Sequence, residues 1–112
     1  MSILNIPNLK YSSTNNFLLI AGPCVIENED ISFEIASKIC SISNKLKIPY
    51  VFKGSFKKAN RSKIDSFTGI GDEKALGLLL EVATKYNVPI TTDVHCIEDV
   101  VLAANYVDVI QI

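Results

Sequence analysis

The chain has 112 residues, a formal net charge of −1 and 48% hydrophobic residues. This hydrophobic content is sufficient for one core and excludes a disordered protein, and the near-zero charge excludes a general basic surface for nucleic acid or membranes. No apolar run approaches the ~20 residues of a membrane span, and the N-terminus lacks the basic-then-apolar pattern of a signal peptide.

Short apolar runs alternate with stretches of helical periodicity from residue 17 onward. Residues 1–16, rich in asparagine and serine, are predicted to form an irregular or hairpin extension, and residues 17–112 to form the folded domain. The runs lack polar alternation, which is typical of buried parallel strands. The predicted strands are Phe17–Gly22, Tyr50–Gly54, Pro89–Val94 and Val107–Ile112.

Three helices are predicted between these strands. The first ends at Pro49, and the second begins with Asp72 as its N-cap and stops before Asn87. Apolar residues at steps of three or four predict the buried faces: Ile31, Ile35, Ile39, Ile42 and Leu46 in the first helix, Ala75, Leu76, Leu79, Leu80 and Ala83 in the second, and Ile97, Val100, Val101 and Ala104 in the third. The alternation predicts an α/β fold built from βαβ units.

One connection is much longer than the others. Ser55–Gly71 joins the second strand to the second helix, where such loops usually take ~2–6 residues, and it follows the strand end at which parallel α/β enzymes place their sites. Its basic residues, with Lys53 at the strand end, are Lys53, Lys57, Lys58, Arg61 and Lys63. This composition favours binding of a phosphorylated, anionic substrate, and the alternative is a solvated basic loop.

Alternation along the second strand places Val51, Lys53 and Ser55 on one face. A lysine within a buried strand requires a counter-charge, because an unpaired buried charge is costly. Lys53 therefore either meets an internal carboxylate or faces a cavity that an anionic ligand occupies.

Polar residues also gather at the ends of the third and fourth strands. Thr91, Asp93 and His95 share a face on the third, and Gln111 ends the fourth. Asp93 and His95 are candidates for an acid/base or orienting pair, and the alternative is a core aspartate beside a loop histidine.

The three cysteines follow no disulfide or zinc spacing, which predicts reduced thiols and a cytoplasmic protein. Cys24, just after the first strand, is a buried apolar residue, a reactive thiol or a soft metal ligand. Cys40 is predicted to pack beside the apolar face of the first helix, and Cys96 has no evident partner.

Four ordered motifs, AGPCVIEN (21–28), PYVFKGSFKKANRS (49–62), TTDVHC (91–96) and VDVIQI (107–112), resemble the 3-deoxy-8-phosphooctulonate synthase (KDO-8-phosphate synthase) family. KANRS separates this family from the related DAHP synthases, which carry a KPRTS-like motif. The resemblance implies the first half of a (β/α)8 TIM barrel.

The resemblance implies a transferase that condenses phosphoenolpyruvate with arabinose 5-phosphate, releasing phosphate, in lipopolysaccharide inner-core biosynthesis. Lys53, Ser55, Lys58 and Gln111 would then surround phosphoenolpyruvate, and Asp93 and His95 would line the reacting centre, with Lys58 also catalytic. Arabinose 5-phosphate would be bound by Asn60, Arg61 and Ser62. A divalent metal of the Zn, Fe or Mn type would bind Cys24, with its other ligands beyond residue 112.

Some positions depart from the family pattern, including Lys57 in place of a commoner Asp, Thr68 where Arg is frequent and Cys96 where Glu is common. A complete barrel needs ~250 residues, so the chain is expected to be an N-terminal fragment that is inactive alone. A homo-oligomer is expected for the full-length enzyme. The alternatives are a DAHP-like or sialic-acid-synthase-like condensation and a non-catalytic phosphate-binding remnant.

Overall fold

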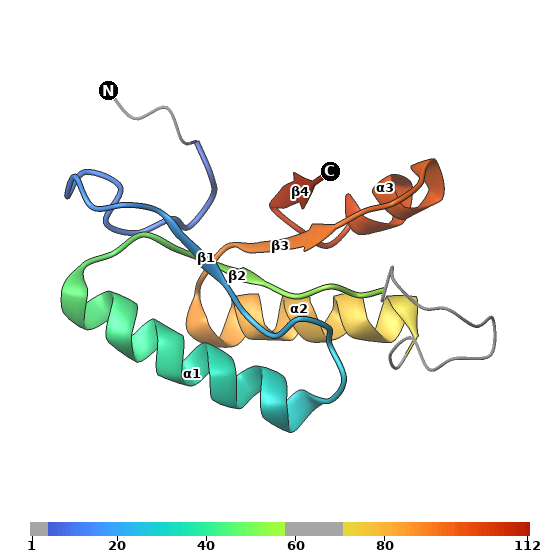
Figure 1. Ribbon diagram of the computed structural model, residues 1–112, viewed down its shortest axis with the longest axis horizontal. Helices are drawn as coiled ribbons and strands as arrows, with labels where there is room; N and C mark the ends of the chain where they lie inside the picture. Colours follow the sequence, from blue (N-terminus) through green and yellow to red (C-terminus); the bar gives the residue numbers. More distant parts are fainter. Residues whose placement is uncertain (1–4, 58–70) are drawn as a thin grey trace.

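The computed structural model describes residues 5–57 and 71–112, in which strands and helices alternate along the chain (Figure 1). The elements are β1 (Leu19–Ala21), α1 (Glu29–Leu46), β2 (Tyr50–Lys53), α2 (Asp72–Tyr86), β3 (Ile90–Asp93), α3 (Ile97–Ala103) and β4 (Val109–Gln111). Each predicted strand is present but one to three residues shorter at one or both ends.

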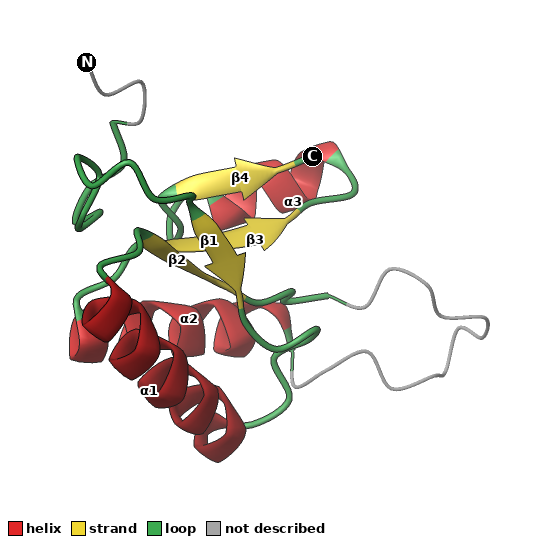
Figure 2. Cartoon of the chain, turned by 60° about the vertical axis from the view of Figure 1, so that its left-hand side comes forward, coloured by secondary structure: helices red, strands yellow, loops and turns green. Residues whose placement is uncertain are grey.

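The four strands form one parallel sheet in the order β1-β2-β3-β4. Figure 2 shows α1 and α2 next to each other on one face of this sheet. A sequential parallel sheet with a helix between successive strands is the arrangement of the first half of a (β/α)8 barrel, as predicted. All strand C-termini therefore lie along one edge.

The two faces of the sheet differ in character. Tyr50, Phe52 and Ile90 belong to the hydrophobic core beneath the helices. Their neighbours Lys53 and Thr91 are paired in register and lie on the opposite face, because side chains alternate along a strand. The predicted alternation of β2 and β3 is confirmed, and the helix-free face carries the polar residues.

The predicted buried face of α1 was partly wrong. Ile31, Ile42 and Leu46 are exposed, whereas the buried positions are the small residues Ser32, Ala36, Cys40 and Ser43. Small side chains allow the helix to lie close to the sheet, and the larger Ile35 and Ile39 pack at the margin of the contact. The predicted packing role of Cys40 is confirmed.

The start of α2 also differs from the prediction. Gly71, with φ of 111°, is the N-cap, and Asp72 is the first helical residue without a side-chain capping bond. The predicted end is confirmed, since Asn87 adopts the left-handed conformation. Leu78 and Val82 are buried in place of the predicted Leu80, which is exposed.

The predicted face of α3 points away from the core. Ile97 and Val101 are 80% and 66% exposed, whereas Asp99 and Ala103 are buried. Polar contacts of Asp99, described below, draw that side of the helix inward, and apolar periodicity carries no information about them.

Residues 5–16 form turns without a helix or strand, and they cover the C-terminal end of α1. Thr14 Oγ1 and Asn16 Nδ2 donate to the carbonyl oxygen of Lys47 over 3.0 and 2.8 Å. These bonds satisfy a carbonyl that the helix end leaves unpaired. Within the described residues, no helix has the length and apolar character that crossing a membrane requires.

Candidate active site at the strand ends

The described candidate residues gather at the C-terminal edge of the sheet, from four successive strands. Asp93 on β3 is paired in register with Gln111 on β4, and Lys53 on β2 with Thr91 on β3. Cys24 follows β1 and is exposed. Lys58, Asn60, Arg61 and Ser62 lie outside the described residues, so their predicted roles stay predictions.

Two glycines bring the end of β1 close to β2. A Cβ atom on Gly22 would lie 1.8 Å from the carbonyl oxygen of Lys53, and one on Gly54 would lie 2.4 Å from Cδ1 of Ile26. Their absent side chains allow the chain after β1 to continue alongside β2, where the Ile26 amide donates to the Ser55 carbonyl oxygen over 2.9 Å. This contact holds the backbone of Ser55 in place.

A hydrogen-bonded chain of three side chains occupies this edge. Ser55 Oγ donates to Oδ1 of Asp93, and His95 Nε2 lies 2.9 Å from Oδ2 of the same carboxylate. Solvent exposure increases from Ser55 to His95, since Ser55 is buried while the side chains of Asp93 and His95 are 19% and 41% exposed. The predicted pairing of Asp93 and His95 is thus present, with Ser55 as a third member, and it leaves the imidazole accessible to a ligand.

The environment of Asp93 keeps its carboxyl group ionised. Desolvation by burial is the largest influence and acts to raise the pKa of Asp93, but the hydrogen bond from Ser55, a backbone hydrogen bond, the charge of Lys53 and the hydrogen bond from His95 together outweigh it. The pKa of Asp93 is therefore lowered. An ionised Asp93 can orient His95 and stabilise a positive charge on its ring.

Lys53 projects from the helix-free face and is half-buried. It forms no ion pair with a carboxylate of the described residues, although its charge favours ionisation of Asp93. The choice between the two alternatives for Lys53 stays a prediction, because residues 58–70 of the adjoining loop lie outside the described residues.

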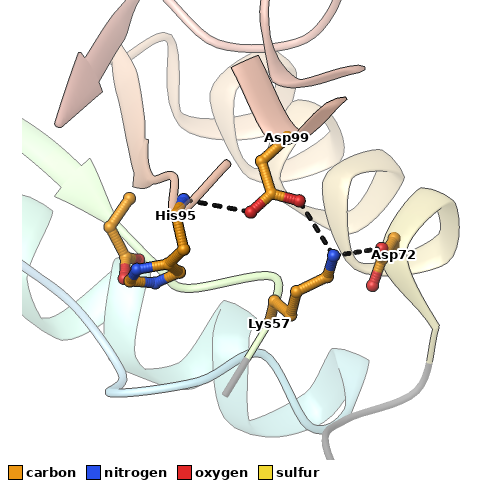
Figure 3. Close-up of polar contacts among 5 residues, drawn as sticks. Lys57, Asp72, His95 and Asp99 are labelled. Carbon is orange, nitrogen blue, oxygen red and sulfur yellow. Dashed lines mark hydrogen bonds and ion pairs between the residues drawn. The ribbon is translucent and has the colours of Figure 1, made fainter. Parts of the chain in front are cut away.

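A second polar cluster lies beside the first and was missed by sequence reasoning (Figure 3). Lys57 Nζ lies 2.8 Å from Oδ1 of Asp99 and 3.3 Å from Oδ2 of Asp72, and Oδ2 of Asp99 accepts the His95 amide over 3.0 Å. The hydrogen bond to Asp99 is the main cause of a raised pKa for Lys57. An acidic residue at the third position of a helix resembles the Glu or Gln of a capping box, which accepts the N-cap amide, but Asp99 accepts the amide of His95, one residue before the N-cap Cys96. The sequence therefore offered only a partial signal for Asp99.

The described residues do not complete a metal site. In residues 5–57 and 71–112, no three His, Cys, Asp or Glu side chains lie together as a metal would require. Cys24 and Cys96 are both exposed thiols at this edge, and Gln111 is exposed at the end of β4.

Several curated proteins are similar to almost the whole chain. The chain is 42% identical over 110 residues to the 2-dehydro-3-deoxyphosphooctonate aldolase of Rickettsia typhi, covering 98% of the chain and 40% of the relative. The proteins of the same name from Paracidovorax citrulli and Francisella tularensis subsp. holarctica are 48% and 44% identical, over 85% and 97% of the chain. The chain spans 40% of the Francisella protein and 33% of the Paracidovorax protein.

A family profile matches nearly the same range. The profile of the DAHP synthetase I family matches residues 7–112, which includes all four strands and both polar clusters. The sequential parallel sheet and its polar C-terminal edge agree with this match. The chain belongs to the DAHP synthetase I family.

Proposed function

We propose that this chain supplies the N-terminal strands of a synthase that condenses phosphoenolpyruvate with arabinose 5-phosphate to 3-deoxy-D-manno-octulosonate 8-phosphate and phosphate. The observation that carries the proposal is the Ser55–Asp93–His95 chain beside Lys53, on the strand-end edge where barrel enzymes bind substrates. The 2-dehydro-3-deoxyphosphooctonate aldolase name shared by its relatives gives the reaction class.

The positive charge of Lys53 suits the carboxylate and phosphate of phosphoenolpyruvate. Lys53, Ser55, Lys58 and Gln111 would surround this substrate, while Asn60, Arg61 and Ser62 would bind the sugar phosphate. Cations aimed at developing negative charge stabilise a transition state because they require no reorganisation during the reaction.

The proposed chemistry joins two carbon atoms and releases phosphate. The enol carbon of phosphoenolpyruvate attacks the sugar aldehyde, whose oxygen takes up a proton, and water adds to the carbon that bears the phosphate ester. Phosphate then leaves and the keto group forms. The ionised Asp93 orients His95 for proton transfer at this centre.

A chimera tests this function. Residues 1–112 would replace the matching segment of the Rickettsia typhi protein, which supplies the remaining strands, and phosphate release would be measured with phosphoenolpyruvate and arabinose 5-phosphate. We expect turnover that K53M and D93N each reduce by at least about 100-fold, the scale of a lost charge-stabilising or acid/base group. A folded chimera without turnover would refute the proposal.

The family profile supports a second candidate, a DAHP-type condensation with erythrose 4-phosphate. Parallel assays with the two sugar phosphates separate the candidates. Faster turnover with erythrose 4-phosphate would favour the second.

We also propose that Cys24 is one ligand of a divalent metal whose other ligands come from the remainder of the enzyme. The exposure of its thiol at the strand-end edge supports this role.

The three free thiols support a reducing, cytoplasmic location. The exposed apolar side chains of Ile97 and Val101 support a homo-oligomer. Cell fractionation and sedimentation of the full-length enzyme test these last two points.

A further inference from the structure

Lys57 joins three segments that are distant in the sequence. It follows β2, and its ammonium contacts Asp99 near the start of α3 and Asp72 at the start of α2 (Figure 3). The preceding residue, Phe56, is buried in the core, which fixes the backbone from which Lys57 extends.

Asp99 depends on this lysine because its carboxylate is buried. Its side chain is only 3% exposed, and a buried carboxylate is stable only when charges or hydrogen bonds compensate for the loss of water. Lys57 donates to Oδ1 of Asp99, and the His95 amide donates to Oδ2. Lys57 is the one cation in contact with Asp99 among the described residues.

Asp99 in turn connects Lys57 to the candidate active site. It holds the backbone of His95, and the imidazole of His95 contacts Asp93, which accepts from Ser55. Ser55 and Lys57 are two residues apart, so the network closes into a ring that begins and ends on the segment after β2. The ring ties the β3–α3 connection to that segment at two points.

We propose that Lys57 is a positioning residue that acts through Asp99 to set the place of His95. This role differs from direct substrate binding, because the ammonium of Lys57 is already engaged by two carboxylates. Its importance for catalysis rests on the proposed function, whereas its effect on His95 does not.

The test uses NMR on the 112-residue chain, in which His95 is the single histidine and its ring signals are therefore unambiguous. Hydrogen exchange of the His95 amide and the ring shifts would be compared between wild type and K57M. The matched control is K38M, which removes the same charge from an exposed pair with Glu34.

In K57M we expect the His95 amide to exchange about tenfold faster, the effect of weakening one hydrogen bond to a charged group, with altered ring shifts. K57R should show the wild-type exchange rate of the His95 amide and the wild-type ring shifts, and K38M should change neither. Wild-type exchange and shifts in folded K57M would overturn the proposal. If K57M does not fold, K57Q, which keeps a donor without the charge, decides: exchange at least about threefold faster supports the proposal, and unchanged exchange overturns it.

The chimera described above gives a second readout. A positioning role predicts that K57M lowers kcat about tenfold while KM for phosphoenolpyruvate stays within about threefold, whereas loss of a direct contact would mainly raise KM. A raised KM with unchanged kcat would overturn the proposal. An inactive wild-type chimera would refute the proposed function but leave the NMR result standing.

Discussion

Asp93 is the residue at which the interactions of the candidate site meet. Ser55 and His95 bond its two oxygens, and the charge of Lys53 favours its ionised form. Because these influences and a backbone hydrogen bond together outweigh desolvation, a change in any one of them should be measurable as a shift in the titration of Asp93.

The variant S55A should raise the pKa of Asp93. Removing the hydroxyl donor destabilises the carboxylate relative to the protonated acid, while burial continues to favour the neutral form. Carbon-detected NMR of the Asp93 carboxyl group measures the change. The control S41A removes an exposed serine from α1 and should leave the titration as in wild type. An unchanged or lowered pKa in S55A would contradict the hydrogen bond.

Cys24 permits a test of the proposed metal in the chimera. We expect a chelator to abolish activity of the chimera and added divalent metal to restore it, and C24N to lower the bound metal content measured by elemental analysis. C40S in the chimera is the control, because Cys40 packs in the core. Full activity of the chimera after metal removal would exclude the metal role of Cys24.

Among the elements, α3 shows how a polar contact can orient a helix. Its apolar residues Ile97 and Val101 face outward, while Asp99 faces inward toward Lys57 and the His95 amide. Ala103, four residues after Asp99, is buried in the hydrophobic core on the same side of the helix. The orientation of α3 therefore depends on an ion pair as well as on hydrophobic burial.

The stability that Lys57 and Asp99 contribute should depend on pH. Burial acts to raise the pKa of Asp99, but Lys57, the His95 amide and the Cys96 side chain lower it overall. This stabilisation is therefore present above the ordinary value of 3.8 and is lost as the pH falls through the lowered pKa. The raised pKa of Lys57 gives its contribution to stability the opposite pH dependence. Its contribution is present below 10.5 and is lost as the pH rises through the raised value.

We therefore expect K57M to lower the free energy of unfolding by about 1–2 kcal/mol near pH 7, less than for a fully buried pair because Lys57 remains partly solvated. The difference from wild type should shrink towards zero as the pH falls through the lowered pKa of Asp99, since protonation then breaks the pair in the wild type and K57M lacks it at every pH. Urea unfolding at pH 7 and at successively lower pH values, down to protonation of Asp99 in the wild type, measures it. A difference that stays constant after Asp99 is protonated would show that the charge of Lys57 is not responsible.

At the scale of the whole molecule, the described sheet is open. β1 and β4 each pair with one neighbour, and the face that carries Lys53 and Asp93 has no helix against it. In a closed barrel this face would be enclosed by further strands. In the proposed function, the strand-end edge would therefore provide one side of the substrate site.

The purified 112-residue chain should release no phosphate from phosphoenolpyruvate and arabinose 5-phosphate. One side of a site can bind an anion, but it cannot exclude water or surround both substrates. The measurement is the phosphate assay used for the chimera, with the chimera as the positive control. Synthase activity of the chain alone would refute this prediction.

Much of the fold followed from local patterns. The apolar runs located all four strands, and α2 stops before Asn87 as predicted, whereas α1 ends at Leu46 with Lys47 in the left-handed conformation, before the predicted end at Pro49. The helix faces were harder to predict, because small residues such as Ala36 line the contact of α1 with the sheet. Apolar periodicity gives most weight to large side chains, which here lie at the margin or in solvent.

The sequence by itself determined which strand residues share the polar face. Period-two alternation and parallel pairing place Lys53 and Asp93 together without reference to distant contacts. Only the tertiary structure decided that Lys57 pairs with Asp99, because these residues are 42 positions apart and a charge meets its partner only where two strand ends are brought side by side. An ion pair has no sequence period, so folding alone selects which of many charged residues become partners.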